Sequence, residues 1–214
     1  MSELLVAALS PTGHIEPLLA VAEDLICRGD RVTVMTGPAH TEVIRTIGAH
    51  AHPLPPEADF GYSTFDAAQR GAHTGIDEAI IRLFIRPMRA QAATLRGALA
   101  ERRYDAIIVD YGFFGILPLL LGGDGKGDRD LPPVLYYTPT PLLLSSRDTA
   151  PTGMGLPPAT TVAGRLLHRG MTVFSQKVLL RKAQRAADRE LTALGARRLP
   201  VPLLDVGVLA DRLL

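Results

Sequence analysis

Residues 4–36 read LLVAALSPTGHIEPLLAVAEDLICRGDRVTVMT, and this stretch contains one strand–helix–strand pattern. Its first six residues are all apolar, which is typical of a strand that is covered on both faces of a parallel sheet. A turn at 10–14 follows, and apolar residues then recur at helical spacing until Gly29. The next strand is indicated at 31–36. A strand, a crossover helix and a second strand predict a protein of the α/β class.

The alternation of strands and helices continues along the rest of the chain. Strands are expected at 50–54, 105–109, 134–137 and 206–214, and helices at 38–47, 76–99, 113–121 and 171–194. Pro87 should kink the second of these helices, because its nitrogen cannot donate to the carbonyl of residue 83. The stretches 53–75, 122–130 and 138–170 are expected to be irregular. The pattern predicts one doubly wound parallel sheet in a single domain over residues 1–214.

Composition excludes several classes of protein. The chain has 23 Lys and Arg against 22 Asp and Glu, and its net charge of +1 gives no reason to expect nucleic acid or acidic lipid as a partner. With 47% hydrophobic residues it can build a full core. The single cysteine, Cys27, excludes an internal disulfide and a zinc site of paired thiolates, and we expect it to be buried. The apolar run at 4–9 lacks a basic flank and is too short for a signal peptide or a membrane span, so we expect a soluble cytoplasmic protein.

Ligands of an open parallel sheet bind beyond the carboxyl ends of its strands, so the residues that follow each strand are candidates for a site. His14 follows the first strand and stands at the N-terminus of a helix, whose dipole disfavours the imidazolium form. Asp110 follows the fourth strand. If the two strands are neighbours, Asp110 can accept a hydrogen bond from one ring nitrogen of His14 and leave the other nitrogen as a base. The alternative is that both residues only cap helices.

Cofactor and metal sites find little support in the sequence. A dinucleotide site needs three glycines after the first strand and an acidic residue after the second, but the first loop offers only Gly13 and the second strand ends at Thr36. Pro11 and Ile15 argue against a flavodoxin-type phosphate loop. The basic residues of 171–194 favour a solvated face, and contact with a membrane surface is the alternative. No metal site is expected, because the spacing of metal ligands is missing from the remaining histidines, which are His40, His50, His52, His73 and His168.

Three segments resemble the family 1 GT-B glycosyltransferases, the bacterial macrolide and natural-product enzymes that are related to UDP-glycosyltransferases. Residues 11–22, PTGHIEPLLAVA, resemble the opening of these enzymes, and residues 104–110, YDAIIVD, resemble the segment that bears the Asp of this family. Residues 143–148, LLSSRD, together with 153–158, resemble the loop after the fifth strand. The resemblance runs in order along nearly the whole chain. It implies one Rossmann-like, acceptor-binding domain over residues 1–214, the N-terminal half of a GT-B fold, without the nucleotide-sugar-binding domain.

The resemblance also implies roles for individual residues. His14 would be the general base that deprotonates a hydroxyl of the acceptor, and Asp110 would orient it. The hydroxyl would attack the anomeric carbon with inversion as the nucleoside diphosphate leaves. The nucleotide sugar would be a co-substrate, and neither a metal nor another cofactor would be required. Thr12, Gly13 and Thr140 would touch the sugar or phosphate of the donor.

An acceptor pocket for such compounds must be largely apolar. Each candidate for its lining could instead be an ordinary core residue. The candidates are Phe60, Tyr62, Phe84, Met88, Phe113, Phe114, Leu142 and Met154. The leading hypothesis is the acceptor-binding half of an inverting glycosyltransferase for a hydrophobic small molecule, such as a natural product, an antibiotic or a lipid. The isolated chain should be inactive, because the donor cleft needs both halves. The alternative is a non-catalytic binding or helper module derived from the same fold.

Overall fold

The computed structural model describes residues 1–59, 75–122, 131–140, 143–151 and 154–213. Their core is a six-stranded sheet with the order β3-β2-β1-β4-β5-β6, in which all neighbours are parallel. The strand order reverses between β1 and β4, so the expected doubly wound α/β fold is confirmed. The strands are β1 (Glu3–Ala7), β2 (Arg31–Thr36), β3 (His50–Pro53), β4 (Ala106–Asp110), β5 (Val134–Tyr137) and β6 (Arg212–Leu213).

Helices alternate with these strands. The α-helices are α1 (Thr12–Cys27), α2 (Thr41–Thr46), α4 (Ile76–Ile80), α5 (Met88–Glu101), α6 (Leu117–Leu120), α7 (Val162–Phe174) and α8 (Arg181–Ala193). The 3-10 helices are η1 (Pro38–His40), η3 (Phe114–Ile116) and η5 (Leu203–Leu209), and the π-helical turns are η2 (Ile81–Ile85) and η4 (Ser175–Leu179). Within the described ranges, no helix combines the length and the apolar character needed to cross a bilayer.

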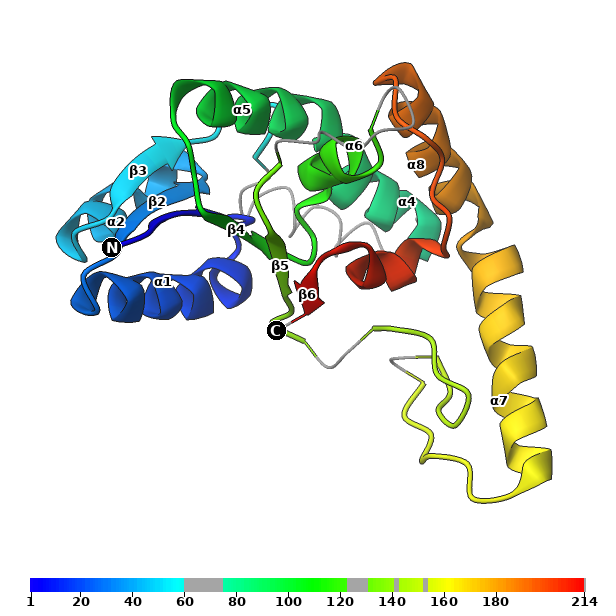
Figure 1. The fold of residues 1–214 in the computed structure, drawn as a ribbon. Coiled ribbons are helices and arrows are strands. Elements are labelled where there is room, and N and C mark those ends of the chain that lie inside the picture. Colours follow the sequence, from blue (N-terminus) through cyan, green and yellow to red (C-terminus); the bar gives the residue numbers. More distant parts are fainter. Residues whose placement is uncertain (60–74, 123–130, 141–142, 152–153, 214) are drawn as a thin grey trace.

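The two faces of the sheet bury separate hydrophobic clusters, because side chains alternate along each strand. Leu4 and Val6 of β1 pack with α1 and α2, whereas Leu5 and Ala7 pack with α5, α6 and α8. Figure 1 shows α1 and α5 on opposite sides of the sheet. Every residue of β1 is buried, which explains why its sequence has no polar alternation.

The helix expected at 76–99 is interrupted at Pro87. The preceding turn is π-helical, and the N–H of Arg86 donates to the carbonyl of Ile81 at 2.9 Å. A regular α-helix resumes only at Met88. Pro87 has no N–H to donate, so the helical hydrogen bonds are interrupted there.

The expected irregular stretch at 138–170 is wrong in its last part. Helix α7 begins at Val162, and Thr161 caps it, because its hydroxyl accepts the N–H of Gly164 at 3.1 Å. The prolines that favoured an irregular backbone end at Pro158, before the cap. The helix expected from residue 171 is therefore the continuation of a longer helical run.

Two further expectations need correction. The strand expected at 206–214 begins inside the 3-10 helix η5, which continues to Leu209, and among the described residues only Arg212–Leu213 pairs with β5. Cys27 was expected to be buried, because it follows the apolar residues of α1. It is the last residue of this helix, and it is exposed.

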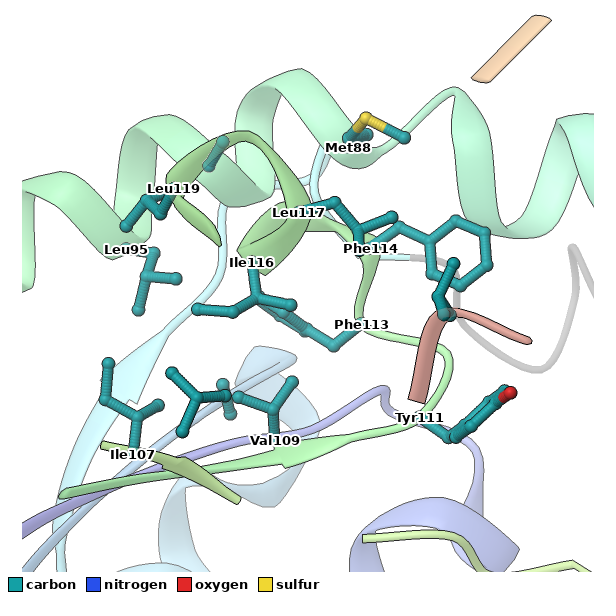
Figure 2. Close-up of a cluster of buried hydrophobic side chains, with 14 of the residues drawn as sticks. Met88, Leu95, Ile107, Val109, Tyr111, Phe113, Phe114, Ile116, Leu117 and Leu119 are labelled. Carbon is teal, nitrogen blue, oxygen red and sulfur yellow. The ribbon is translucent and has the colours of Figure 1, made fainter. Parts of the chain in front are cut away.

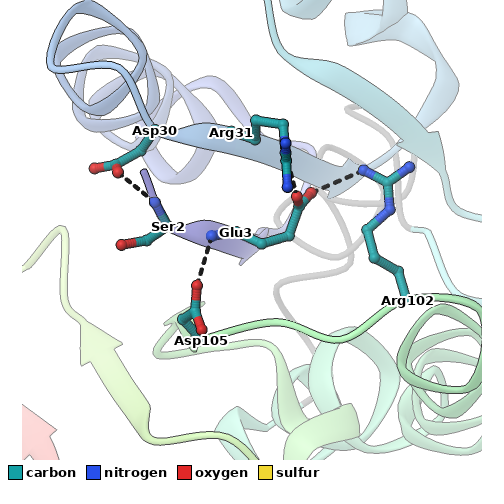
Figure 3. A network of polar contacts seen from close by, with 6 residues as sticks. All are labelled: Ser2, Glu3, Asp30, Arg31, Arg102 and Asp105. Atoms are coloured by element: carbon teal, nitrogen blue, oxygen red, sulfur yellow. Dashed lines mark hydrogen bonds and ion pairs between the residues drawn. The ribbon is translucent and has the colours of Figure 1, made fainter.

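Glu3, the first residue of β1, joins three segments at the amino edge of the sheet (Figure 3). Its buried carboxylate accepts hydrogen bonds from Arg31 Nε at 2.5 Å and from Arg102 at 2.8 Å, and its N–H donates to Asp105 at 2.8 Å. Burial by itself would raise the pKa of Glu3, but the hydrogen bonds and charges of Arg102 and Arg31 more than offset it. The pKa of Glu3 therefore lies below its ordinary value of 4.5.

Replacement of Glu3 by glutamine is expected to lower the free energy of unfolding by about 1–3 kcal/mol at neutral pH, because the carboxylate that pairs with two arginines is replaced by a neutral amide with one acceptor oxygen. Folding lowers the pKa of Glu3, so the contribution of its charge is present above the unfolded pKa and disappears as the pH falls through the folded value. The difference between the two proteins should thus shrink below pH 4.5, the ordinary pKa. Urea unfolding near neutrality and in acid measures both effects. As a control, Glu42→Gln removes an exposed ion pair with Arg45 and should cost less than about 0.5 kcal/mol. Equal losses in the two variants would contradict the prediction.

Candidate active site

The first turn of α1 presents His14 at the carboxyl edge of the sheet. Helix α1 begins directly after Pro11, whose carbonyl accepts the N–H groups of His14 at 2.8 Å and Ile15 at 3.2 Å. Ile15 and Leu18 are fully buried against the sheet, so they fix the rotation of the helix. His14 lies between the core and solvent, with 26% of its side chain exposed.

Asp110, the last residue of β4, meets His14 across the edge of the sheet. Strands β1 and β4 are neighbours, with Ala7 opposite Val109, so the residues that follow β1 lie beside Asp110. The Nδ1 atom of His14 lies 2.9 Å from one carboxylate oxygen of Asp110 and 3.0 Å from the other. Asp110 is fully buried. The structure thus brings together the two residues that the sequence singled out, and their chemical roles stay a prediction.

This contact determines which nitrogen of His14 can act as a base. An ionised carboxylate can only accept hydrogen bonds, so the proton of a neutral imidazole resides on Nδ1 and points at Asp110. The Nε2 atom then carries the lone pair and is the nitrogen that can take a proton from a ligand. If the ring gains a second proton, the buried carboxylate stabilises the resulting positive charge.

Ser10 ties the loops that follow β1, β2 and β3 together. Its hydroxyl accepts the N–H of Gly37 at 3.0 Å and donates to the carboxylate of Asp59, and its carbonyl accepts a hydrogen bond from His40 Nε2 at 2.8 Å. A Cβ atom at Gly37 would overlap the Ser10 hydroxyl and the Asp59 carboxylate. This network holds the backbone that leads into the first turn of α1.

The sequence analysis missed this network, although one of its signals was available. Ser10 and Gly37 each follow a strand, which is the same criterion that selected His14 and Asp110. Asp59 carries no such signal, since it is 49 residues from Ser10 in a stretch without periodicity.

Two tyrosines close the core beside Asp110, and neither can serve as a base. The rings of Tyr111 and Tyr136 lie 5.8 Å apart. Burial raises the pKa of Tyr111 to about 12 and raises the pKa of Tyr136 as well, so both hydroxyls stay protonated at neutral pH. The Tyr111 hydroxyl donates to the carbonyl of Leu204 and thereby joins the end of β4 to η5.

Most described candidates for the acceptor pocket are core residues in this structure. Met88 and Phe113 are fully buried and Phe114 is nearly so, in the cluster where α5 packs against η3 (Figure 2). Phe84 is partly buried against this cluster, with its ring centroid 5.8 Å from that of Phe114. The expected lining role is thus corrected for Met88 and Phe113, whose surfaces are covered by neighbouring side chains.

The other candidates are dispersed. Phe60, Tyr62 and Leu142 lie outside the described residues. Met154 is 37% exposed. It belongs to the segment before α7, and Figure 1 shows this segment at a distance from the sheet. Of the candidates for donor contacts, Thr12 and Gly13 form the start of α1, next to His14, and Thr140 lies three residues beyond β5.

Comparisons with known proteins agree with this arrangement. No protein-family model matches the chain. The chain is 31% identical over 192 residues to 4'-demethylrebeccamycin synthase of Lentzea aerocolonigenes, which covers 87% of this chain and 44% of that protein. It is 30% identical over 203 residues to UDP-glucosyltransferase 1 of Beauveria bassiana (strain ARSEF 2860), which covers 90% of this chain and 44% of that protein. The chain therefore spans less than half the length of these relatives.

Solved structures show the same fold. The crystal structure of the glycotransferase of kitacinnamycin matches 99% of this chain and 45% of its own, with a TM-score of 0.65 and 17% sequence identity. SsfS6, a glycosyltransferase of Streptomyces sp. SF2575, matches 95% of this chain and 49% of its own, with a TM-score of 0.53 and 14% identity. In sequence and in fold, the chain is similar to part of the family 1 GT-B glycosyltransferases, and it shares the Rossmann-like architecture of their solved structures.

Proposed function

We propose that this chain is the acceptor-binding half of an inverting glycosyltransferase, which moves a sugar from a nucleotide-sugar donor to a hydroxyl of a hydrophobic small molecule. The observation that carries the proposal is the contact between His14 and Asp110 at the carboxyl edge of the sheet. It supplies a base of fixed tautomer that is part exposed and backed by a buried carboxylate. A hydroxyl is a poor nucleophile until its proton is removed, so this is the group that such a reaction requires.

The reaction would proceed in one displacement. The acceptor hydroxyl donates its hydrogen bond to His14 Nε2, and its oxygen attacks the anomeric carbon of the sugar from the face opposite the nucleotide. The C–O bond to the nucleoside diphosphate breaks with its electron pair on the phosphate oxygen, while the hydroxyl proton moves to Nε2. Asp110 then faces an imidazolium, whose charge it stabilises.

The start of α1 supports a donor phosphate nearby. Helix N-termini attract anions, because their first N–H groups point outward and the helix dipole is positive there. Gly13 lies in this turn and is exposed, and apart from its chain neighbours and the backbone of its own helix, no atom of the described residues lies within 4 Å of the place where a Cβ would be. A phosphate or a sugar hydroxyl can therefore approach the backbone closely at this residue.

Retention of both members of the pair favours an enzyme over a helper module. A buried carboxylate is costly unless it is paired, and a scaffold gains nothing from an orienting contact to a partly exposed ring. The relatives include a synthase named for demethylrebeccamycin and a UDP-glucosyltransferase, and this supports a natural-product acceptor and a nucleotide sugar as donor.

The test is to supply the other half. We define the chimeric enzyme as residues 1–214 joined to the C-terminal half of the Lentzea aerocolonigenes relative. Incubated with UDP-glucose or TDP-glucose and a panel of hydroxylated aromatic aglycones, the chimeric enzyme should yield glucosides that mass spectrometry detects. Residues 1–214 alone should yield none, because the donor site is missing.

Two controls make this result decisive. The relative's own N-terminal half, rejoined to the same C-terminal half by the same junction, shows that the junction permits activity. Transfer by residues 1–214 alone would refute the need for a second half. A folded chimeric enzyme without transfer to any aglycone, beside an active rejoined control, would instead favour the helper module.

A further inference from the structure

Helix α7 and the adjoining turn η4 carry an unusual exposed apolar surface. Leu166 is 64% exposed, Leu167 is 62% exposed and Phe174 is 52% exposed. Single exposed apolar residues are ordinary, but a contiguous row of them on one helix marks a surface that is covered by something. Figure 1 shows α7 extending away from the sheet. The remaining members of the row are Val162, Val173, Val178 and Leu179.

Positive charge accompanies this apolar row. Residues 162–179, which form α7 and η4, contain Arg165, Arg169 and Lys177 and no Asp or Glu. A shallow groove on this face is lined by three arginines, three of the exposed apolar side chains and two hydroxyl residues. These are Arg147, Arg165, Arg169, Val162, Leu166, Val173, Ser146 and Thr172. One carboxylate lies close by, since Asp148 pairs with Arg165 at 2.8 Å, so the groove keeps an excess of positive charge.

We propose that the face formed by α7, η4 and Arg147 lies on the surface of an anionic lipid bilayer. A helix with leucine, valine and phenylalanine on one side and arginine beside them is suited to the boundary between headgroups and acyl chains. The apolar side chains enter the acyl region, and the arginines bind headgroup phosphates, which guanidinium groups can hold by paired hydrogen bonds. This proposal does not depend on the sugar-transfer activity.

Charge decides between a bilayer and a second copy of the chain. A two-fold interface brings the same patch of each copy together, so the excess positive charge of this face would meet an equal excess on the other copy. Like charges across an interface are unfavourable, and Asp148 alone cannot neutralise them. An anionic bilayer satisfies the apolar row and the arginines at the same time.

Vesicle flotation tests the proposal. Residues 1–214 should float with vesicles of phosphatidylcholine and phosphatidylglycerol in equal parts, and remain below vesicles of pure phosphatidylcholine. Arg165→Gln combined with Arg169→Gln should weaken binding about 30-fold, because each basic residue near an anionic surface contributes about a fivefold gain in affinity. The matched control, Arg185→Gln with Arg189→Gln, removes the same charge from α8, where the described residues include no exposed large apolar side chain, and should weaken binding much less.

A spectroscopic probe tests insertion independently. The chain has no tryptophan, so Phe174→Trp provides a single reporter at an exposed position. Its emission should shift to the blue on anionic vesicles and be quenched by brominated acyl chains. Leu166→Ser with Leu167→Ser should abolish the shift, and circular dichroism should show that these exposed positions leave the fold intact.

Three outcomes would overturn the proposal. Equal binding to both vesicle types would remove the role of charge, and absence of binding would remove the bilayer altogether. Sedimentation equilibrium that shows a dimer, lost in the Leu166→Ser, Leu167→Ser variant, together with no vesicle binding, would assign the face to a second copy.

Discussion

Replacement of His14 by alanine is expected to lower kcat of the chimeric enzyme about 10²- to 10⁴-fold, because the acceptor hydroxyl loses its general base. The Nε2 atom is the only proton acceptor that the contact with Asp110 leaves available on the ring. The KM for the nucleotide sugar should change little, because the base acts on the acceptor. Initial rates at varied donor concentration and saturating acceptor, followed by mass spectrometry, measure both parameters.

The control for this variant is another histidine outside the site. His50 is exposed at the start of β3, the amino edge of the sheet, so His50→Ala should leave kcat unchanged. A His14→Ala enzyme that retains more than about a tenth of the activity would remove His14 from the role of base.

The sequence was most informative where local pattern and global fold agree. The uninterrupted apolar run of β1 predicted a strand covered on both faces, and helices do cover both faces. The contact of His14 with Asp110 was predicted from the rule that functional residues follow the carboxyl ends of parallel strands, together with the assumption that β1 and β4 are neighbours.

The sequence-based predictions failed where the type of a residue does not determine whether it is buried or what it contacts. An apolar side chain near a strand end can line a pocket or fill the core, and Met88 and Phe113 do the latter because α5 packs directly over η3. The start of helix α7 was missed, because the prolines up to Pro158 favoured an irregular backbone and the cap at Thr161 was not recognised. The Ser10–Asp59 hydrogen bond joins residues that only the fold brings together.

Replacement of Asp110 by asparagine is expected to lower kcat of the chimeric enzyme about 10²-fold with the fold intact. Asparagine has the same shape, but its amide N–H can donate to Nδ1 of His14. This contact favours the tautomer with the ring proton on Nε2, and a protonated Nε2 cannot take the proton of the acceptor hydroxyl. The negative charge that stabilises the imidazolium is lost as well.

Stability separates this role from a structural one. If Asp110 mainly served the fold, the asparagine variant should lose stability together with activity. If it orients His14, urea unfolding should show nearly unchanged stability, because removal of a buried charge offsets the weaker hydrogen bond. The double variant His14→Ala, Asp110→Asn completes the argument: without the imidazole there is nothing left to orient, so it should be no slower than His14→Ala alone. If the fold-losses in kcat of the two single variants multiply in the double variant, Asp110 contributes to the reaction by a route that does not pass through His14.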